Sequence, residues 1–171
     1  MNIHEYRSQI EKRKDPYKCW IRENERWRGE SVPAGLVRDF RDSYELRYEP
    51  GYVKDPDVEE RFALYASRGD YDLIYCDEDV ISENHRTDPY FKPDYSPDTL
   101  ESFGYMGGLI AVNKKFIHSE QSGERAVPEK VCHIPEVLYH SKGYKDYEYT
   151  GNSSDDEIFV DRSDDIISVI I

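Results

Sequence analysis

The sequence predicts an α/β fold, in which a small mixed sheet is flanked by helices and preceded by a helical lead-in. Short apolar runs rich in β-forming residues occur at 73–76, 107–113 and 131–140. Continuous apolar runs of this kind are typical of strands that are covered on both faces. A helix is expected at 57–67, just before the first run, because its apolar residues recur at helical spacing after an Asp-Pro start.

The composition favours one acidic domain. A chain of 171 residues is long enough to bury a core, although only 37% of its residues are hydrophobic and 35% are charged. The formal net charge of −13 argues against nucleic acid and against an anionic membrane surface as partners. No run approaches the roughly 20 apolar residues of a membrane span, and no secretory leader opens the chain. The sequence therefore predicts a cytoplasmic protein with reduced thiols at Cys19, Cys76 and Cys132.

The lead-in is predicted to be helical and to cover residues 1–30. Asp15 and Pro16 form a good helix start, since Asp can cap a helix and Pro is tolerated in its first turn. The aromatic and apolar residues that follow share one face, which is expected to be a packing surface: Tyr17, Trp20, Ile21 and Trp27. Residues 31–69 are polar and punctuated by Pro and Gly, and the helix at 57–67 is the one element expected within them.

Three carboxylates follow the first apolar run: Asp77, Glu78 and Asp79. We expect the strand to end where they begin and to deliver them to the sheet edge, where ligands gather in open α/β folds. In an extended segment Asp77 and Asp79 would point the same way. Oxygen ligands placed like this could hold Mg²⁺ or Mn²⁺ beside a diphosphate. The alternative is that the cluster is a solvated turn of an acidic chain.

The region from Tyr71 to Val112 carries a specific order of motifs. They are Cys76-Asp77-Glu78-Asp79, the segment Asp88 to Asp98 (DPYFKPDYSPD), Thr99 to Ser102, and Gly104 to Gly108. In order and spacing they resemble the later half of the catalytic domain of family 2 glycosyltransferases, especially the rhamnosyltransferase-like members that build bacterial surface polysaccharides. The chain departs from the family pattern at four positions: Cys76 stands for Ser, Tyr95 for Trp, Gly104 for Asn and Gly108 for His.

The resemblance implies the acceptor half of a type A glycosyltransferase, with a nucleotide sugar and a glycan acceptor as partners and a divalent metal, Mg or Mn, as cofactor. The substrate-binding residues that it implies are Asp77, Glu78, Asp79, Lys92, Asp94, Asp98 and Tyr105. The metal ligands expected are Asp77 and Asp79, from their spacing, and His140, from the resemblance. In the family pattern the cluster of Asp77 to Asp79 is not the main metal motif, which lies upstream, but a second acidic site nearer the acceptor side. The stretch 131–140 also matches the family and places His140 at the rim of the active site, whereas His133 is expected to be structural.

No catalytic base can be named. Inverting sugar transfer needs a carboxylate that takes the proton of the acceptor hydroxyl. The stretch 119–129 carries Glu120, Glu124 and Glu129, but it lacks the motif that holds the base in the family. The catalytic residue therefore stays unassigned.

The nucleotide-binding half that the family places before Tyr71 is missing from this sequence. Residues 31–142 are therefore expected to be a truncated glycosyltransferase-like domain, and 143–171 an acidic linker that ends in an apolar strand. One hypothesis is a glycosyltransferase-like protein, of a family whose complete members transfer a sugar from a nucleotide sugar to a bacterial surface polysaccharide. As an isolated chain it is expected to be inactive, and another glycosyltransferase chain is a candidate partner. The other is a non-catalytic remnant or module that binds a glycan or a partner glycosyltransferase.

Overall fold

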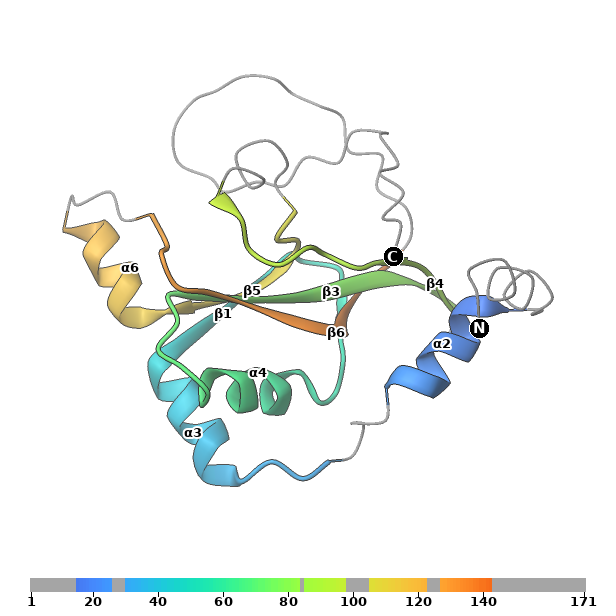
Figure 1. The fold of residues 1–171 in the computed structure, drawn as a ribbon, viewed down its shortest axis with the longest axis horizontal. Helices are drawn as coiled ribbons and strands as arrows, with labels where there is room; N and C mark the ends of the chain where they lie inside the picture. The colour runs from blue at the N-terminus through green and yellow to red at the C-terminus, as the bar shows by residue number, and fades with distance from the viewer. Residues whose placement is uncertain (1–14, 26–29, 84, 98–104, 123–126, 143–171) are drawn as a thin grey trace, which may run out of the picture.

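The computed structural model describes residues 15–25, 30–83, 85–97, 105–122 and 127–142, and these ranges form a curled mixed sheet flanked by helices (Figure 1). The strands are β1 (Tyr44–Tyr48), β2 (Val53–Lys54), β3 (Leu73–Ser82), β4 (His85–Tyr90), β5 (Leu109–Asn113) and β6 (Val131–Ser141). The helices are α2 (Pro16–Asn24), α3 (Ala34–Ser43), α4 (Val58–Ala66) and α6 (Lys114–Gln121). The predicted α/β class is confirmed.

The long strand β3 organises the sheet. The strands follow the order β1-β5-β3-β6-β2, and β4 pairs with β3 outside this path. β6 runs parallel to β3 on one side. On the other side β5 pairs antiparallel with the first residues of β3, from Leu73 to Tyr75, and β4 pairs antiparallel with later residues, from Glu78 to Ser82. The predicted strands at 73–76, 107–113 and 131–140 are therefore neighbours in one sheet.

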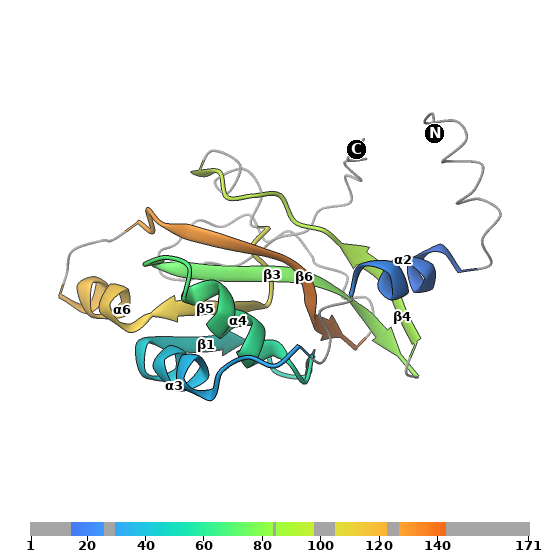
Figure 2. The ribbon, with the colours of Figure 1, turned by 60° about the horizontal axis from the view of Figure 1, so that its bottom comes forward.

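Helices α3 and α4 pack together on one face of the sheet (Figures 1 and 2). Phe62 of α4 is fully buried there, beside Phe40 of α3, with 6.2 Å between the ring centroids. Ile74 of β3 belongs to the same core cluster. Burying a side chain as large as Phe62 contributes about 2–3 kcal/mol. The apolar spacing that predicts the helix at 57–67 thus reflects its packing against the sheet.

The second core cluster contains Leu73 and Tyr75, which alternate along β3 with Ile74 of the first cluster. Alternate residues of a strand point to opposite faces, so this cluster belongs to the face opposite α3 and α4. Tyr105 and Met106 complete it, and both are buried. The segment 91–97, which follows β4, is tied to this cluster because Tyr75 donates a hydrogen bond to a carbonyl of that segment.

The prediction that the first strand ends at the carboxylates is wrong. β3 continues through Asp77, Glu78 and Asp79 to Ser82, and all three carboxylates are buried. Buried carboxylates are tolerated when cations neutralise them, and each of the three has a basic or imidazole partner in the fold. Neither the strand end nor the alternative of a solvated turn describes this part of the chain.

The stretch 31–69 holds more structure than predicted. Besides α4 it forms α3, β1 and the two-residue strand β2. β1 lies at one edge of the sheet, and its Glu45 and Arg47 are exposed, so its composition resembles that of a loop. A helix is confirmed at Pro16–Asn24 within the predicted lead-in, where Asp15 caps it by accepting from the Lys18 amide at 2.9 Å.

Some predictions fall outside the described residues. They concern the lead-in before Asp15 and at 26–29, which includes Trp27, the motif residues at 98–104, which include Asp98, and the linker and apolar strand at 143–171. Within the part of the chain that the structure describes, no helix is both long enough and apolar enough to cross a membrane.

Candidate functional site

The candidate site is built around the three consecutive carboxylates of β3. Asp77 is 3%, Glu78 is 6% and Asp79 is 1% exposed. The pairing of β3 with β6 shifts register at two places, between Cys76 and Asp77 and between Asp77 and Glu78. Because of these irregularities, the three carboxylates take different partners from different parts of the chain.

Asp79 is held by three side chains. The parallel ladder pairs Asp79 with His140 in register, and His140 Nδ1 lies 2.5 Å from Asp79 Oδ1. The other oxygen, Oδ2, accepts from Arg86 Nε and from the Tyr17 hydroxyl, each at 2.6 Å. Burial lowers the pKa of His140, but hydrogen bonds with Asp55 and Asp79 outweigh it, so that the pKa lies above its ordinary value. The predicted neighbours Asp79 and His140 are thus brought together.

Arg86 connects Asp79 to the lead-in helix. Its guanidinium also pairs with Glu25, which directly follows α2, at 2.7 Å and 2.9 Å. On the same helix Trp20 packs on Phe91, with 4.6 Å between ring centroids. α2 thus lies beside β4 (Figure 1) and contacts Asp79 through Tyr17.

Glu78 pairs with Lys92, whose side chain is 1% exposed, at 3.0 Å. The Lys92 ammonium also donates to the backbone carbonyls of Cys76, at 2.7 Å, and Met106, at 2.8 Å. Burial lowers the pKa of Lys92 to about 8. Gly107 lies next to this ammonium with a φ of +83°, and a Cβ there would clash with Lys92 Nζ, so the position requires glycine.

Asp77 is linked to the molecular surface through a histidine. Its Oδ1 accepts from the Lys92 backbone amide at 2.9 Å and lies 2.8 Å from His133 Nε2. The other ring nitrogen of His133, Nδ1, lies 3.1 Å from Asp94, whose side chain is 98% exposed. Burial lowers the pKa of His133, but the hydrogen bonds and charges of the two aspartates raise it above its ordinary value. Tyr75 stacks on the imidazole at 4.8 Å and fixes its plane.

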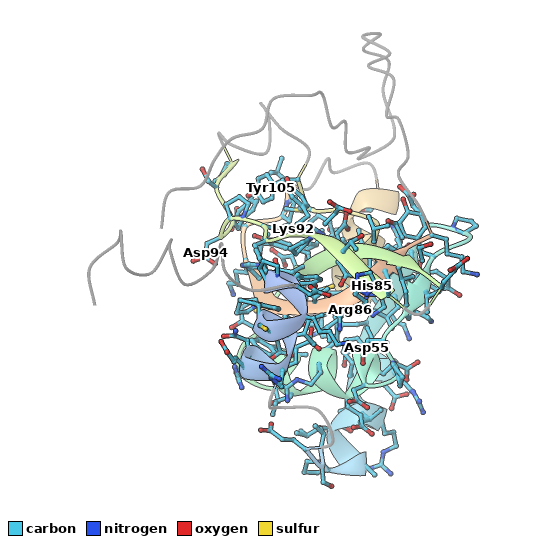
Figure 3. The ribbon with its side chains drawn as sticks, turned by 90° about the vertical axis from the view of Figure 1, so that its right-hand side faces the viewer. Asp55, His85, Arg86, Lys92, Asp94 and Tyr105 are labelled. Carbon is cyan, nitrogen blue, oxygen red and sulfur yellow. The ribbon has the colours of Figure 1, made fainter. Side chains whose placement is uncertain are left out.

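An open cavity of about 570 Å³ lies at the exposed end of this Asp77-His133-Asp94 chain. It is lined by Asp70, Tyr71, Asp94, Tyr95, Glu129, Lys130, Val131 and His133. In Figure 3 Asp94 lies at the outer edge of the molecule, on the same side as Lys92 and Tyr105 and away from Asp55.

The substrate-binding residues that the resemblance implies thus fall into separate groups. Asp94 lines the cavity and is linked through His133 to buried Asp77, whereas Glu78, Asp79 and Lys92 are buried and do not line it. Tyr105 is also buried, and its hydroxyl accepts from the Ser96 amide at 2.9 Å. Asp98 lies outside the described residues.

The carboxylates as arranged do not fit a divalent cation. Such an ion needs oxygen or nitrogen ligands with free coordination positions. Arg86, Tyr17 and His140 already contact both oxygens of Asp79, while Asp77 takes different partners. In the described ranges, no group of three or more His, Cys, Asp or Glu side chains is placed to hold a metal ion. The metal site stays a prediction, and it would require Arg86 to leave Asp79.

Several residues of the network were not predicted from the sequence, above all Arg86 as the cation of Asp79 and His133 as the link between Asp77 and Asp94; Glu25 and Asp55 were not predicted either. A general signal was present, because buried carboxylates require cations. The sequence did not indicate which residues would pair with the carboxylates. His133, for example, is 56 residues away from Asp77 in the sequence, and the two meet only through the pairing of β3 with β6.

Comparison with known proteins gives one finding of note. The O-antigen biosynthesis protein RfbC of Myxococcus xanthus is 30% identical to this chain over 86 residues, which cover 41% of this chain and 7% of that protein. The chain thus spans only a small part of the length of this relative. No protein-family model matches the sequence, and no solved structure matches it significantly. Part of this chain is therefore similar to an O-antigen biosynthesis protein.

Proposed function

We propose that this chain is a glycosyltransferase-like protein of bacterial surface-polysaccharide biosynthesis, and that its sheet is a glycan-binding module that does not itself transfer sugar. It would act in the cytoplasm beside a partner glycosyltransferase. The similarity to an O-antigen biosynthesis protein supports the process. The observation that carries the non-catalytic role is that Asp77, Glu78 and Asp79 are all paired with basic or imidazole groups of the chain itself.

The chemistry of sugar transfer explains why this pairing matters. A transferase that uses a nucleotide sugar must neutralise the departing diphosphate with a metal or with free cations. Here Lys92 and Arg86 are committed to carboxylates, and both oxygens of Asp79 already contact other side chains. This pairing supports a role of the network in stabilising the fold.

A second candidate is sugar transfer in which another chain supplies the donor-binding half, together with any divalent cation. One observation favours it. Asp94 is exposed in the cavity and is backed by His133, which is a geometry suited to a carboxylate that accepts a proton from an acceptor hydroxyl.

Calorimetry on the full chain separates the two. Oligosaccharides released from bacterial O-antigen and the nucleotide sugars UDP-glucose and dTDP-rhamnose with Mn²⁺ are titrated in parallel. We expect heat from at least one oligosaccharide and none from either nucleotide sugar. Heat from a nucleotide sugar that requires Mn²⁺ would favour transfer, and no heat from any oligosaccharide would refute the module.

A further inference from the structure

The cavity beside Asp94 has walls that are fixed before any ligand arrives. The segment 93–96 forms one wall, and two tyrosines hold it from the sheet side. Tyr75 donates to the Pro93 carbonyl at 2.6 Å, and the Tyr105 hydroxyl accepts from the Ser96 amide at 2.9 Å. A wall of this kind lowers the entropy lost on binding, because it need not be ordered by the ligand.

The opposite wall is the stretch before β6. Asp72 accepts from the backbone amides of Glu129, at 2.9 Å, and Lys130, at 3.0 Å. Tyr95 joins the two walls, since its hydroxyl donates to the Pro128 carbonyl at 3.0 Å. The Tyr95 hydroxyl is thus committed to the scaffold, while the residue lines the cavity.

Asp94 is the side chain in this cavity that is best placed to bind a ligand. One oxygen, Oδ1, lies 3.1 Å from His133 Nδ1, and the histidine is anchored in turn on buried Asp77. The side chain is 98% exposed, and the described residues offer Oδ2 no contact. One oxygen is therefore fixed and the other is directed to solvent, where it can accept hydrogen bonds.

The charge and the aromatic content of the lining define the ligand class. Three carboxylates and two basic side chains line the cavity: Asp70, Asp94, Glu129, Lys130 and His133. The chain as a whole carries a net charge of −13, so phosphates and uronic acids are repelled. Neutral sugars offer many hydroxyl donors for carboxylates and an apolar ring face for tyrosines such as Tyr71 and Tyr95.

We propose that this cavity is the subsite that binds a neutral sugar residue of the glycan. Asp94 accepts hydrogen bonds from the sugar hydroxyls, and His133 is a positioning residue that holds Asp94 in place. The inference rests on the proposed function, and it adds the location of the subsite and the class of sugar.

The test is an NMR titration of the full chain with methyl glycosides of rhamnose, mannose, glucose and galactose, and with UDP and methyl glucuronoside as anionic probes. We expect saturable binding of at least one neutral glycoside and no binding of the anionic probes. Asp94→Asn removes the accepting charge and is expected to weaken binding about tenfold or more. The matched control is Asp42→Asn, because Asp42 is exposed and does not line this cavity, and this variant should bind like the wild type.

The role of His133 is tested by a double-variant cycle. If His133 acts through Asp94, Asp94→Asn should cause little further loss in a His133→Gln background. Additive losses would show that His133 is merely structural. The melting temperature of every variant shows whether the fold is retained, and Asp94→Asn is expected to keep it because the side chain is exposed.

The remaining outcomes separate this inference from the proposed function. If O-antigen oligosaccharides bind the wild type but Asp94→Asn binds them equally well, the subsite is wrong and the glycan-binding module stands. Binding of UDP or methyl glucuronoside as strong as that of the neutral glycosides would overturn the sugar class. Failure of every oligosaccharide and glycoside to bind the wild type would overturn both.

Discussion

At the scale of single residues, Lys92 shows how one side chain joins three parts of the chain. Its ammonium contacts Glu78 and the Cys76 carbonyl on β3, and the Met106 carbonyl just before β5. The segment that contains Lys92 forms a wall of the cavity farther along. Lys92 therefore contributes to stability directly and to the cavity indirectly.

We predict that Lys92→Met lowers the free energy of unfolding by about 3 kcal/mol or more, because Glu78 would be left as a buried charge without its cation. Urea unfolding followed by circular dichroism measures the change. Lys115→Met is the matched control, since Lys115 is exposed on α6 and should cost less than about 0.5 kcal/mol. A Lys92→Met variant as stable as this control would show that the ion pair contributes nothing to the fold.

At the scale of elements, α2 is attached to the sheet by polar contacts more than by apolar burial. None of its residues is fully buried. It is held by the Tyr17 hydroxyl on Asp79, by the pairing of Glu25 with Arg86 and by the contact of Trp20 with Phe91. Elements that bury little apolar surface open more readily than the core.

We predict that Glu25→Gln loosens α2 and leaves the core sheet intact. The Glu25 side chain is 2% exposed and pairs with Arg86, so the substitution removes one charge of a buried pair. Native-state hydrogen exchange should show faster exchange for the amides of α2, by about tenfold, with unchanged exchange in β3 and β5. Lys18→Gln, at an exposed position of the same helix, should leave the exchange of α2 unchanged. Equal protection of α2 in both variants would contradict this account of its attachment.

The helices and strands also show which parts of the fold could be predicted from the sequence alone. The core strands β5 and β6 and the helix α4 were predictable because their apolar patterns match their burial. β1 was not, because as an edge strand it exposes Glu45 and Arg47. The continuation of β3 through Asp77 to Asp79 could not be predicted for another reason. The carboxylates can be buried only because Arg86, His133 and other residues pair with them, and these residues come near the carboxylates only in the folded sheet.

At the scale of the whole molecule, the acidic chain keeps part of its positive charge inside the fold. Lys92 and Arg86 are committed to carboxylates within the sheet, and these carboxylates are themselves buried. His133 and His140 contribute further positive charge when they are protonated, and their pKa values are raised by Asp77 and Asp94 in one case and by Asp55 and Asp79 in the other.

This arrangement predicts that stability falls as pH rises from about 6 to about 8. A histidine whose pKa is raised in the folded state stabilises it fully below its ordinary pKa of 6.5, and this contribution is lost as pH rises through the folded value. His133 faces Asp77 and Asp94, while His140 faces Asp55, Asp79 and Arg86, whose charge opposes the shift only in part. Each extra proton bound by the folded state adds a slope of about 1.4 kcal/mol per pH unit.

Melting temperatures at about pH 6, 7 and 8 test this in the wild type and in the variant His133→Gln, His140→Gln. The range stops near pH 8 because the pKa of Lys92 is lowered to about 8, and its loss of a proton in the folded state has the opposite sign at higher pH. Self-repulsion of the acidic chain also grows with pH, but it acts on both proteins alike. The wild type should therefore lose stability more steeply than the variant, whatever their absolute stabilities. Parallel pH profiles would mean that neither histidine is linked to folding through the carboxylates of β3.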